Sequence, residues 1–315
     1  MKWVYTSQRK EYANALTEIG KNRTEVVVLD GDLSSSTRTV EFAKKFPERF
    51  FNVGIAEQNL MGTAAGLATS GKTVFASTFA VFATGRCWDQ VRQSIAYPNL
   101  NVKIVATHAG ITVGGDGASH QALEDIGLMR SLPNMTVIVP ADGLEAYKAV
   151  KAAADHHGPC YVRLGRADVP LLTTMESPFA VGKATVLREG KDVSLVGCGQ
   201  MVAACMDAAE ELAKRGIEAE VVNMSTIKPM DEGTLVRSAK KTGAVVTAEE
   251  HSVATGLGSA VASVLSENYP VPVKMIGTPD CFGESGESEE LMRRYGLTAE
   301  RVASAAEDVI GRKRA

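Results

Sequence analysis

The side chains best suited to chemistry lie in a few polar stretches of the sequence. The stretch ATHAGITVGGDGASHQALED (106–125) carries His108, Asp116 and His120, and its glycines permit sharp turns or the close approach of a ligand. Glu57 follows NVGIA at the start of a predicted helix. Hydroxyls and arginines occur in DGDLSSSTRT (30–39) and RLGRAD (163–168). Side chains of these types together indicate a binding site for a polar ligand.

Each of these features also has a plainer interpretation. Glu57 can be a first-turn acid that interacts only with the helix dipole. His108, His120 and Asp116 can be loop groups with satisfied hydrogen bonds, or they can bind a metal ion. Their spacing matches no standard zinc pattern, so we predict no metal site in this chain.

The elements that must position these residues follow an alternating pattern. Runs rich in Val and Ile are typical of parallel strands buried on both faces, and helical patterns separate them. We expect strands over 25–33, 72–78, 101–108, 135–141 and 160–165, and then over 193–199, 218–224, 243–249 and 271–277. We expect helices over 57–70, 143–157, 200–214, 231–241, 255–267 and 287–312.

This alternation predicts an α/β fold, in which a doubly wound, mostly parallel sheet is followed by a second, smaller α/β domain. The polar segment from Pro170 to Gly182 places the boundary at about 180, which gives domains of 1–180 and 181–315. Ligands of doubly wound sheets bind beyond the carboxyl ends of the strands. The polar stretches described above follow predicted strands, so we expect their side chains to meet there.

Composition narrows the class of protein. The chain has 315 residues, a net charge of −3 and no long apolar stretch, so we expect neither nucleic acid nor a membrane as partner. Its five cysteines form no CxxC pair, which fits a reducing compartment. We therefore predict a cytoplasmic protein.

Three motifs resemble those of transketolases: VGIAEQN around Glu57, STFAVF (77–82) and the histidine-bearing stretch. The resemblance covers essentially the whole chain, and it implies the pyrimidine-binding domain followed by the C-terminal domain of that family. The family's diphosphate-binding motif is GDG followed 25 to 30 residues later by Asn. GDG at 115–117 is followed too closely by Asn134, so this motif is missing. The chain resembles the C-terminal subunit of a naturally split enzyme.

The resemblance implies that several residues contact the cofactor, thiamine diphosphate. Glu57 would hydrogen-bond a nitrogen of its pyrimidine ring and so promote the proton transfer that activates the cofactor. Phe79 and Phe82 would pack against that ring, although both can equally be core residues. A third aromatic residue of some transketolases is missing here, near Gly85.

The resemblance also implies a sugar-binding set. His108 and His120 would donate hydrogen bonds to substrate oxygens, and Asp116 would accept one from a sugar hydroxyl. The positions that match those handling the substrate phosphate are Arg9 in SQRK, Ser36 in DLSSS and Arg166 in RLGRAD. The plainer interpretation of both arginines is a surface ion pair.

These roles imply reversible transfer of a two-carbon ketol unit from a ketose phosphate to an aldose phosphate, in the pentose phosphate pathway or in a specialised sugar pathway. The missing motif implies a partner, the transketolase N-terminal subunit, which would carry GDG…N and bind the diphosphate with Mg²⁺ or Ca²⁺. We therefore expect an α2β2 heterotetramer, built on a dimer of this chain, and no activity of this chain alone.

Three alternatives stay open at the level of sequence. The first is the β subunit of a split 2-oxoacid dehydrogenase, although His108, Asp116 and His120 favour sugar phosphates. The second, a deoxyxylulose-phosphate synthase, shares VGIAEQ but is normally a single long chain. The third is a noncatalytic assembly subunit, against which Glu57 argues. His251 can belong to a site or to an interface, and we expect an interface.

Overall fold

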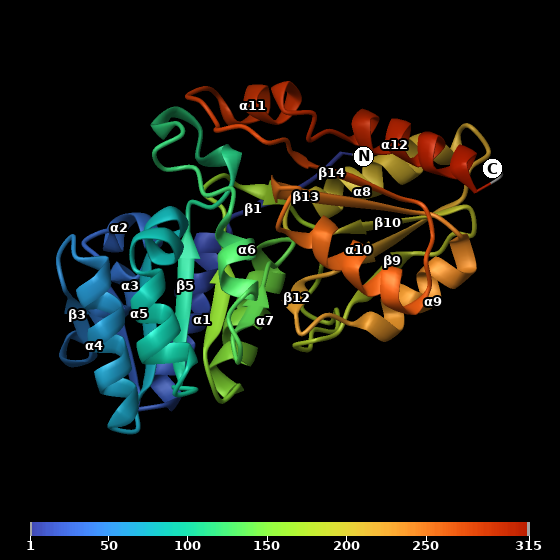
Figure 1. Cartoon of the computed structure of the whole chain (residues 1–315). Helices are drawn as coiled ribbons and strands as arrows, with labels where there is room; N and C mark the ends of the chain where they lie inside the picture. The colour runs from blue at the N-terminus through green and yellow to red at the C-terminus, as the bar shows by residue number, and fades with distance from the viewer. Residues whose placement is uncertain (1, 314–315) are drawn as a thin grey trace.

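The runs rich in Val and Ile form the strands of two separate sheets. In the computed structural model, which describes residues 2–313, the first sheet has seven strands in the order β12-β6-β7-β5-β4-β2-β3, all parallel except β12. Its strands are β2 (Val26–Asp30), β3 (Phe50–Asn52), β4 (Thr73–Phe79), β5 (Val102–Thr107), β6 (Thr136–Ile138), β7 (Cys160–Arg163) and β12 (Thr226–Lys228). This sheet forms the core of one lobe of the molecule, seen at the lower left of Figure 1.

Helices cover both faces of the first sheet, because successive residues of its strands point to opposite sides. In β2, Val26 and Val28 pack under helices α1 (Gln8–Asn22) and α7 (Gly143–Asp155). Val27 and Leu29 face the other side, where α4 (Glu57–Thr69) packs. The predicted doubly wound sheet is thereby confirmed.

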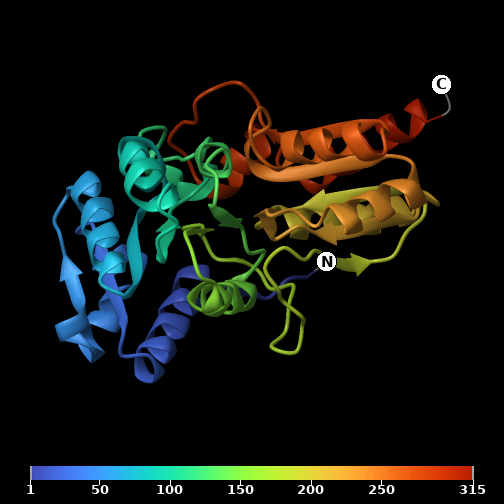
Figure 2. The same cartoon turned by 60° about the horizontal axis from the view of Figure 1, so that its bottom comes forward.

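The second sheet has five strands in the order β14-β13-β10-β11-β9, and only β9 is antiparallel. They are β9 (Thr185–Arg188), β10 (Val193–Gly197), β11 (Ala219–Asn223), β13 (Val245–Ser252) and β14 (Val273–Thr278). Figure 2 shows helices on both sides of this sheet. They are α8 (Met201–Ala213), α9 (Glu232–Thr242), α10 (Leu257–Asn268) and α12 (Ala299–Arg312). The second α/β unit expected from the sequence is therefore present.

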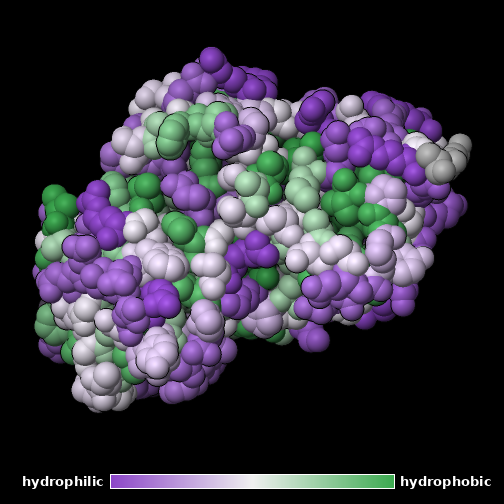
Figure 3. Space-filling model, viewed as in Figure 1, coloured by the Kyte–Doolittle hydropathy of each residue, from purple (hydrophilic) through white to green (hydrophobic). Residues whose placement is uncertain are grey.

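The remaining strands and helices are mostly short. β1 (Tyr5–Thr6) pairs with β8 (Val169–Pro170). The remaining helical segments are α2 (Ser34–Thr37), α3 (Val40–Lys45), η1 (Pro47–Arg49), η2 (Phe82–Arg86), α5 (Trp88–Gln90), η3 (Val91–Ala96), η4 (Ile111–Asp116), α6 (Asp125–Arg130) and α11 (Ser288–Arg294). No helix within residues 2–313 is both long enough and apolar enough to cross a membrane. Hydrophilic and hydrophobic residues are interspersed over the face shown in Figure 3.

Two of the differences from the sequence expectations lie in the C-terminal half of the chain. The helix expected over 287–312 is two helices, α11 and α12, separated by a turn in which Gly296 has a φ of 70°. β12 comes from the C-terminal half of the chain but joins the first sheet, where Thr226 lies opposite Ile138 of β6. The two halves of the chain are thus joined by strand pairing as well as by side-chain packing.

Candidate active site

Aromatic rings meet at the carboxyl ends of two neighbouring strands. Phe79 ends β4, His108 directly follows β5, and these strands pair in parallel. The two rings stack with centroids 3.7 Å apart. Phe82 lies 6.1 Å from Phe79, and His120 meets Phe82 edge-on at 5.4 Å. The structure therefore brings together four residues that the sequence singled out separately.

Glu57 lies beside this aromatic cluster at the first position of α4. Its side chain is 2% exposed, and its Oε2 atom is 3.2 Å from Nη1 of Arg86. The Arg86 guanidinium also lies over the Phe82 ring, 4.6 Å from its centroid. Glu57 is thus a buried carboxylate at the edge of an aromatic wall, held by a half-exposed cation that the sequence analysis did not identify.

The backbone around Phe82 and Arg86 is unusual. Residues Phe82–Arg86 and Val91–Ala96 form two short π-helical segments, separated by α5. Such wide turns are rare and are frequent at functional sites, because they redirect side chains out of a regular helix. Here the first segment supplies both the ring and the cation that face Glu57. A pattern based on a 3.6-residue period cannot reveal such a turn, so sequence reasoning missed Arg86.

His108 is held in a strained and buried position. Its φ of 59° is uncommon for a residue with a side chain, and it is 3% exposed. Its Nδ1 atom is 2.8 Å from the hydroxyl of Thr107. Burial, followed by the positive charges of Arg9 and Arg166, lowers the pKa of His108 to about 3. His108 is therefore neutral near pH 7.

A cavity of about 380 Å³ lies between η4 and the start of α11. Arg9, Arg166 and Asp116 line it, together with the glycines of η4 and the start of α11. Arg9 donates to the backbone carbonyls of Ser36 and Arg166, both at 2.9 Å, and its Nε atom is buried without a hydrogen-bond partner in the part of the chain that is described. The cavity thus carries two guanidiniums that are fixed mainly by backbone carbonyls.

Asp116 and Glu287 are the acidic residues that line the cavity, and Asp116 interacts only weakly with the cations. Nη1 of Arg166 is 3.8 Å from Oδ2 of Asp116, and both side chains are more than 40% exposed. Ser36 contributes its carbonyl to Arg9, so its hydroxyl is not what holds that arginine. Burial and the positive charges of Arg38 and Arg166 lower the pKa of Arg9, which shows that cations crowd together here. This arrangement favours an anionic ligand.

His251 lies at the contact between the two halves of the chain. It is fully buried, its Nε2 accepts from the N–H of Ile126 at 3.1 Å, and its Nδ1 contacts the carbonyl of Ser252 at 2.9 Å. Burial lowers its pKa to about 4, although Asp125 opposes this shift. The described contacts place His251 in the interface between the halves, away from the cavity.

A buried ion pair completes that interface. Arg163 donates to both carboxylate oxygens of Asp125, at 2.7 and 3.2 Å, and the hydroxyl of Tyr161 donates to the same carboxylate at 2.6 Å. Among residues 2–313, no group of three or more His, Cys, Asp or Glu side chains is arranged to hold a metal ion. The charges of Asp125 and Arg163 therefore compensate each other, and neither side chain is among those that line the cavity described above.

Comparison with known proteins identifies the family. The transketolase pyrimidine-binding domain matches residues 5–170, and the transketolase C-terminal domain matches residues 182–302. The chain is 50% identical over 303 residues to the "Putative transketolase C-terminal section" of Methanocaldococcus jannaschii, covering 95% of each chain. It is 45% identical to the "6-deoxy-6-sulfo-D-fructose transketolase subunit SqwH" of a Clostridium species, covering 97% of this chain and 95% of that one.

A solved structure agrees with these matches. The structure described as "Split gene transketolase, inactive beta4 tetramer" superposes with a TM-score of 0.92 at 56% identity, covering 98% of this chain and all of that one. The likeness extends over both lobes, and the identity is far above the level at which only a fold is shared. The chain therefore belongs to the transketolase family and contains its pyrimidine-binding and C-terminal domains.

Proposed function

We propose that this chain is the C-terminal subunit of a two-polypeptide transketolase, which transfers a two-carbon ketol unit from a ketose to an aldose. The observation that carries this proposal is the continuity of the site. A buried carboxylate, Glu57, pairs with Arg86, whose guanidinium lies over Phe82 in a cluster of aromatic rings that includes His108 and His120. Arg9 and Arg166, which line a cavity, lie close enough to His108 to lower its pKa. Relatives described as a C-terminal section and as a split-gene transketolase support it.

The residues around Glu57 fit the pyrimidine end of thiamine diphosphate, the cofactor of the transketolase family. Phe79 and Phe82 offer aromatic surface to a flat ring, and Glu57 offers a desolvated carboxylate that can hold a proton at a ring nitrogen. The position of Arg86 supports this fit. Its guanidinium is flat and donates hydrogen bonds, it pairs with Glu57, and it lies over the Phe82 ring, so the site already accepts a flat donor at this place. When bound, the cofactor supplies the electron sink for carbon–carbon bond cleavage.

The histidines would bind the sugar. If the Thr107 hydroxyl donates to Nδ1 of His108, the proton of the neutral ring is on Nε2, which can then donate to a substrate oxygen. His120 contacts the same aromatic wall and would donate to a neighbouring oxygen. Asp116, at the rim of the cavity, would accept from a sugar hydroxyl. Donors fixed in this way stabilise negative charge on oxygen as carbonyls react.

Arg9 and Arg166 would bind the anionic end of the substrate, with Ser36 orienting Arg9. Two guanidiniums suit any tetrahedral oxyanion, and the Clostridium relative is named for a sulfonated sugar. We therefore propose ketoses with a phosphate or a sulfonate at the far end as donors. The pentose phosphate pathway and a specialised sugar pathway both supply such compounds.

The partner would be an N-terminal subunit that carries GDG…N and holds the diphosphate through Mg²⁺ or Ca²⁺. This chain lacks that motif, and the related split-gene chain is described as an inactive β4 tetramer. Both facts support an α2β2 complex in which the cofactor lies between unlike subunits. A cytoplasmic location fits cytosolic sugar metabolism and is part of the proposal.

A donor panel tests the reaction class. We would reconstitute the complex with the GDG…N-bearing polypeptide of the same organism and supply xylulose 5-phosphate, a 6-sulfonated ketose, an uncharged ketose and pyruvate, each with ribose 5-phosphate as acceptor. The proposal predicts turnover of the anionic ketoses and little turnover of the uncharged one. Turnover of pyruvate alone would assign the chain to the 2-oxoacid dehydrogenase class, and full activity of Glu57→Ala would favour a noncatalytic subunit.

A further inference from the structure

The loop that carries Asp116 and His120 is held by the C-terminal half of the chain. It begins after His108, and its first helical turn, η4, includes Thr112. Oε1 of Glu250 accepts from the backbone N–H of Thr112 at 2.7 Å and from its hydroxyl at 2.8 Å. Glu250 belongs to β13 of the second sheet and is 6% exposed. The buried carboxylate of Glu250, in the C-terminal lobe, thus accepts two hydrogen bonds from the loop of the N-terminal lobe that carries Asp116 and His120.

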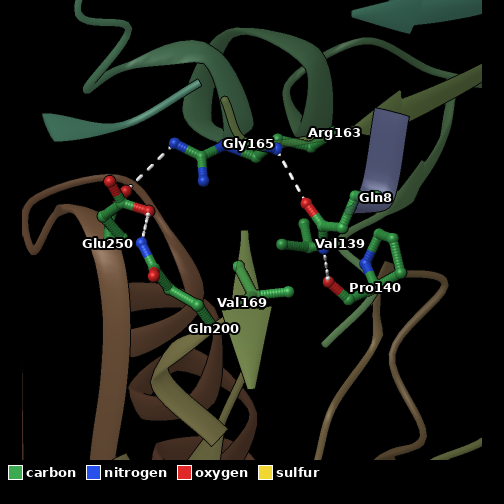
Figure 4. Close-up of a pocket in the computed structure, with 9 residues that line it drawn as sticks. Gln8, Val139, Pro140, Arg163, Gly165, Val169, Gln200 and Glu250 are labelled. Atoms are coloured by element: carbon green, nitrogen blue, oxygen red, sulfur yellow. Dashed lines mark hydrogen bonds between the residues drawn. The ribbon is translucent and has the colours of Figure 1, made fainter. Parts of the chain in front are cut away.

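Further residues fix the Glu250 carboxylate itself. The amide of Gln200, at the start of α8, donates to Oε2 of Glu250 and lies 3.2 Å from the Thr112 hydroxyl. Arg163 donates to the backbone carbonyl of Glu250 at 3.0 Å. Figure 4 shows Gln200, Glu250 and Arg163 around one small cavity between the lobes. These bonds leave the carboxylate little freedom to turn.

The loop approaches Glu250 too closely for a larger residue. A Cβ atom added at Gly110, whose φ is 82°, would lie 2.3 Å from Oε1 of Glu250. A residue with a side chain therefore does not fit at position 110. Gly110 thereby permits a tight contact between the loop and Glu250.

A second set of contacts holds the loop from its other side. The Ser288 hydroxyl, at the start of α11, donates to the carbonyl of Thr112 at 2.9 Å. The Gln121 amide donates to the carbonyls of Ile111 and Glu284, at 3.1 and 2.9 Å. In Figure 1, α11 lies over this loop at the top of the molecule. All the polar atoms of Thr112 are therefore bonded to the C-terminal half.

We propose that Glu250 is a positioning residue for substrate binding, through which the C-terminal domain sets the place of Asp116 and His120. This inference rests on the proposed function. Within residues 2–313, the hydrogen bonds of the Glu250 carboxylate to this loop go to Thr112, and Gly110 packs closely against the same carboxylate. Fixing the loop before substrate arrives removes an ordering cost from binding and from the transition state. The C-terminal domain thereby contributes to substrate recognition without lining the cofactor pocket.

Substitutions at Thr112 test the proposal with little risk to folding. Thr112→Val keeps the shape of the side chain but removes the hydroxyl bonded to Glu250 and Gln200, whereas Thr112→Ser retains it. In the reconstituted complex we expect Thr112→Val to raise the donor KM and to lower kcat/KM about tenfold, as the loss of one hydrogen bond to a charged group typically does. Thr112→Ser should restore most of the activity. The thiamine diphosphate concentration for half-maximal activity should not change.

Variants in the C-terminal half supply the matched controls. Ser288→Ala should also raise the donor KM, because it removes a bond to the Thr112 carbonyl. Ser266→Ala removes a serine bond within α10, far from the loop, and should leave the donor KM unchanged. Glu250→Ala should have the largest effect, and its melting temperature shows whether the domain still folds.

Hydrogen exchange on the isolated chain gives a readout that needs no activity. Thr112→Val and Glu250→Ala should speed amide exchange across residues 109–121 and leave α4 unchanged. Wild-type exchange in that segment together with a wild-type donor KM would overturn the proposal. An equal rise in donor KM and in cofactor half-saturation would also overturn it, since it would show a general structural loss. An inactive wild-type complex would instead refute the proposed function, while the exchange result still decides whether Glu250 holds the loop.

Discussion

Glu57 is buried far more deeply than an ordinary acidic residue in the first turn of a helix. An ordinary first-turn acid is exposed and interacts weakly with the helix dipole. Glu57 instead is 2% exposed, and the guanidinium of Arg86 forms an ion pair with its carboxylate. Burying a carboxylate is costly unless a partner or a ligand compensates. This cost is the physical reason why we propose a cofactor-binding role for Glu57 rather than a role in helix capping alone.

Glu57→Gln should nearly abolish ketol transfer while the complex still assembles. The amide keeps the size of the side chain but cannot hold a proton at a ring nitrogen as a carboxylate does, and such proton-transfer groups contribute roughly 10²–10⁴-fold. Steady-state kinetics with saturating thiamine diphosphate give the measurement. Glu300→Gln is the matched control, since Glu300 is an exposed acid in the first turn of α12. Equal activity of the two variants would contradict the assignment.

His108 should stay neutral throughout the physiological range. Its pKa is lowered from 6.5 to about 3, so the folded chain takes up this proton at lower pH than the unfolded chain does. The contribution of His108 to the free energy of unfolding is therefore complete above pH 6.5 and is lost as the pH falls toward 3. Imidazole ¹⁵N shifts of the isolated chain, recorded from pH 8 to 5, should show one neutral tautomer for His108. Titration near pH 6.5 would contradict the buried geometry.

Regular elements were predictable where one physical pattern dominates. β2 and β5 are buried on both faces, so their Val and Ile content alone identifies them. β3, by contrast, is a three-residue edge strand with two exposed residues and leaves no such pattern. The break between α11 and α12 depends on the backbone of Gly296, whose φ is positive. The direction of the Arg86 side chain depends on the π-helical turn over Phe82–Arg86. Neither feature appears in the spacing of hydrophobic residues.

The start of α10 is an element whose geometry depends on one glycine. The carboxylate of Glu249 accepts from the N–H groups of Leu257 and Gly258, at 2.6 and 2.7 Å. A Cβ atom at Gly256 would lie 1.8 Å from Oε2 of Glu249, which is fully buried and cannot move without losing these bonds. The backbone path at Gly256 therefore fixes how α10 joins β13.

Gly256→Ala should lower the free energy of unfolding by about 1–3 kcal/mol, the usual effect of overpacking a buried site. Chemical denaturation of the isolated chain measures this change. Gly311→Ala in α12 is the control, because a Cβ atom there meets nothing within 4 Å, and it should be neutral or slightly stabilising. Equal stability of the two variants would show that Glu249 can move aside freely.

At the scale of the whole molecule, the two lobes act as one unit. β12 of the C-terminal half extends the first sheet, the buried pair of Asp125 and Arg163 lies at the junction, and Glu250 accepts hydrogen bonds from Thr112. The sequence predicted both α/β units, and the family motifs in it identified most of the candidate site residues. It could not predict which residues cross between the lobes, because contacts such as Thr226 with Ile138 and Glu250 with Thr112 join positions far apart in the sequence that share no local pattern.

Thiamine-diphosphate-dependent ketol transfer should be measured for this chain alone, for the GDG…N-bearing polypeptide alone, and for their mixture. Xylulose 5-phosphate and ribose 5-phosphate serve as substrates, with Mg²⁺ present. The account predicts transfer only in the mixture, because this chain supplies Glu57 and the sugar-binding cavity but no diphosphate-binding motif. Transfer by this chain alone at the rate of the mixture would contradict a site shared between two polypeptides.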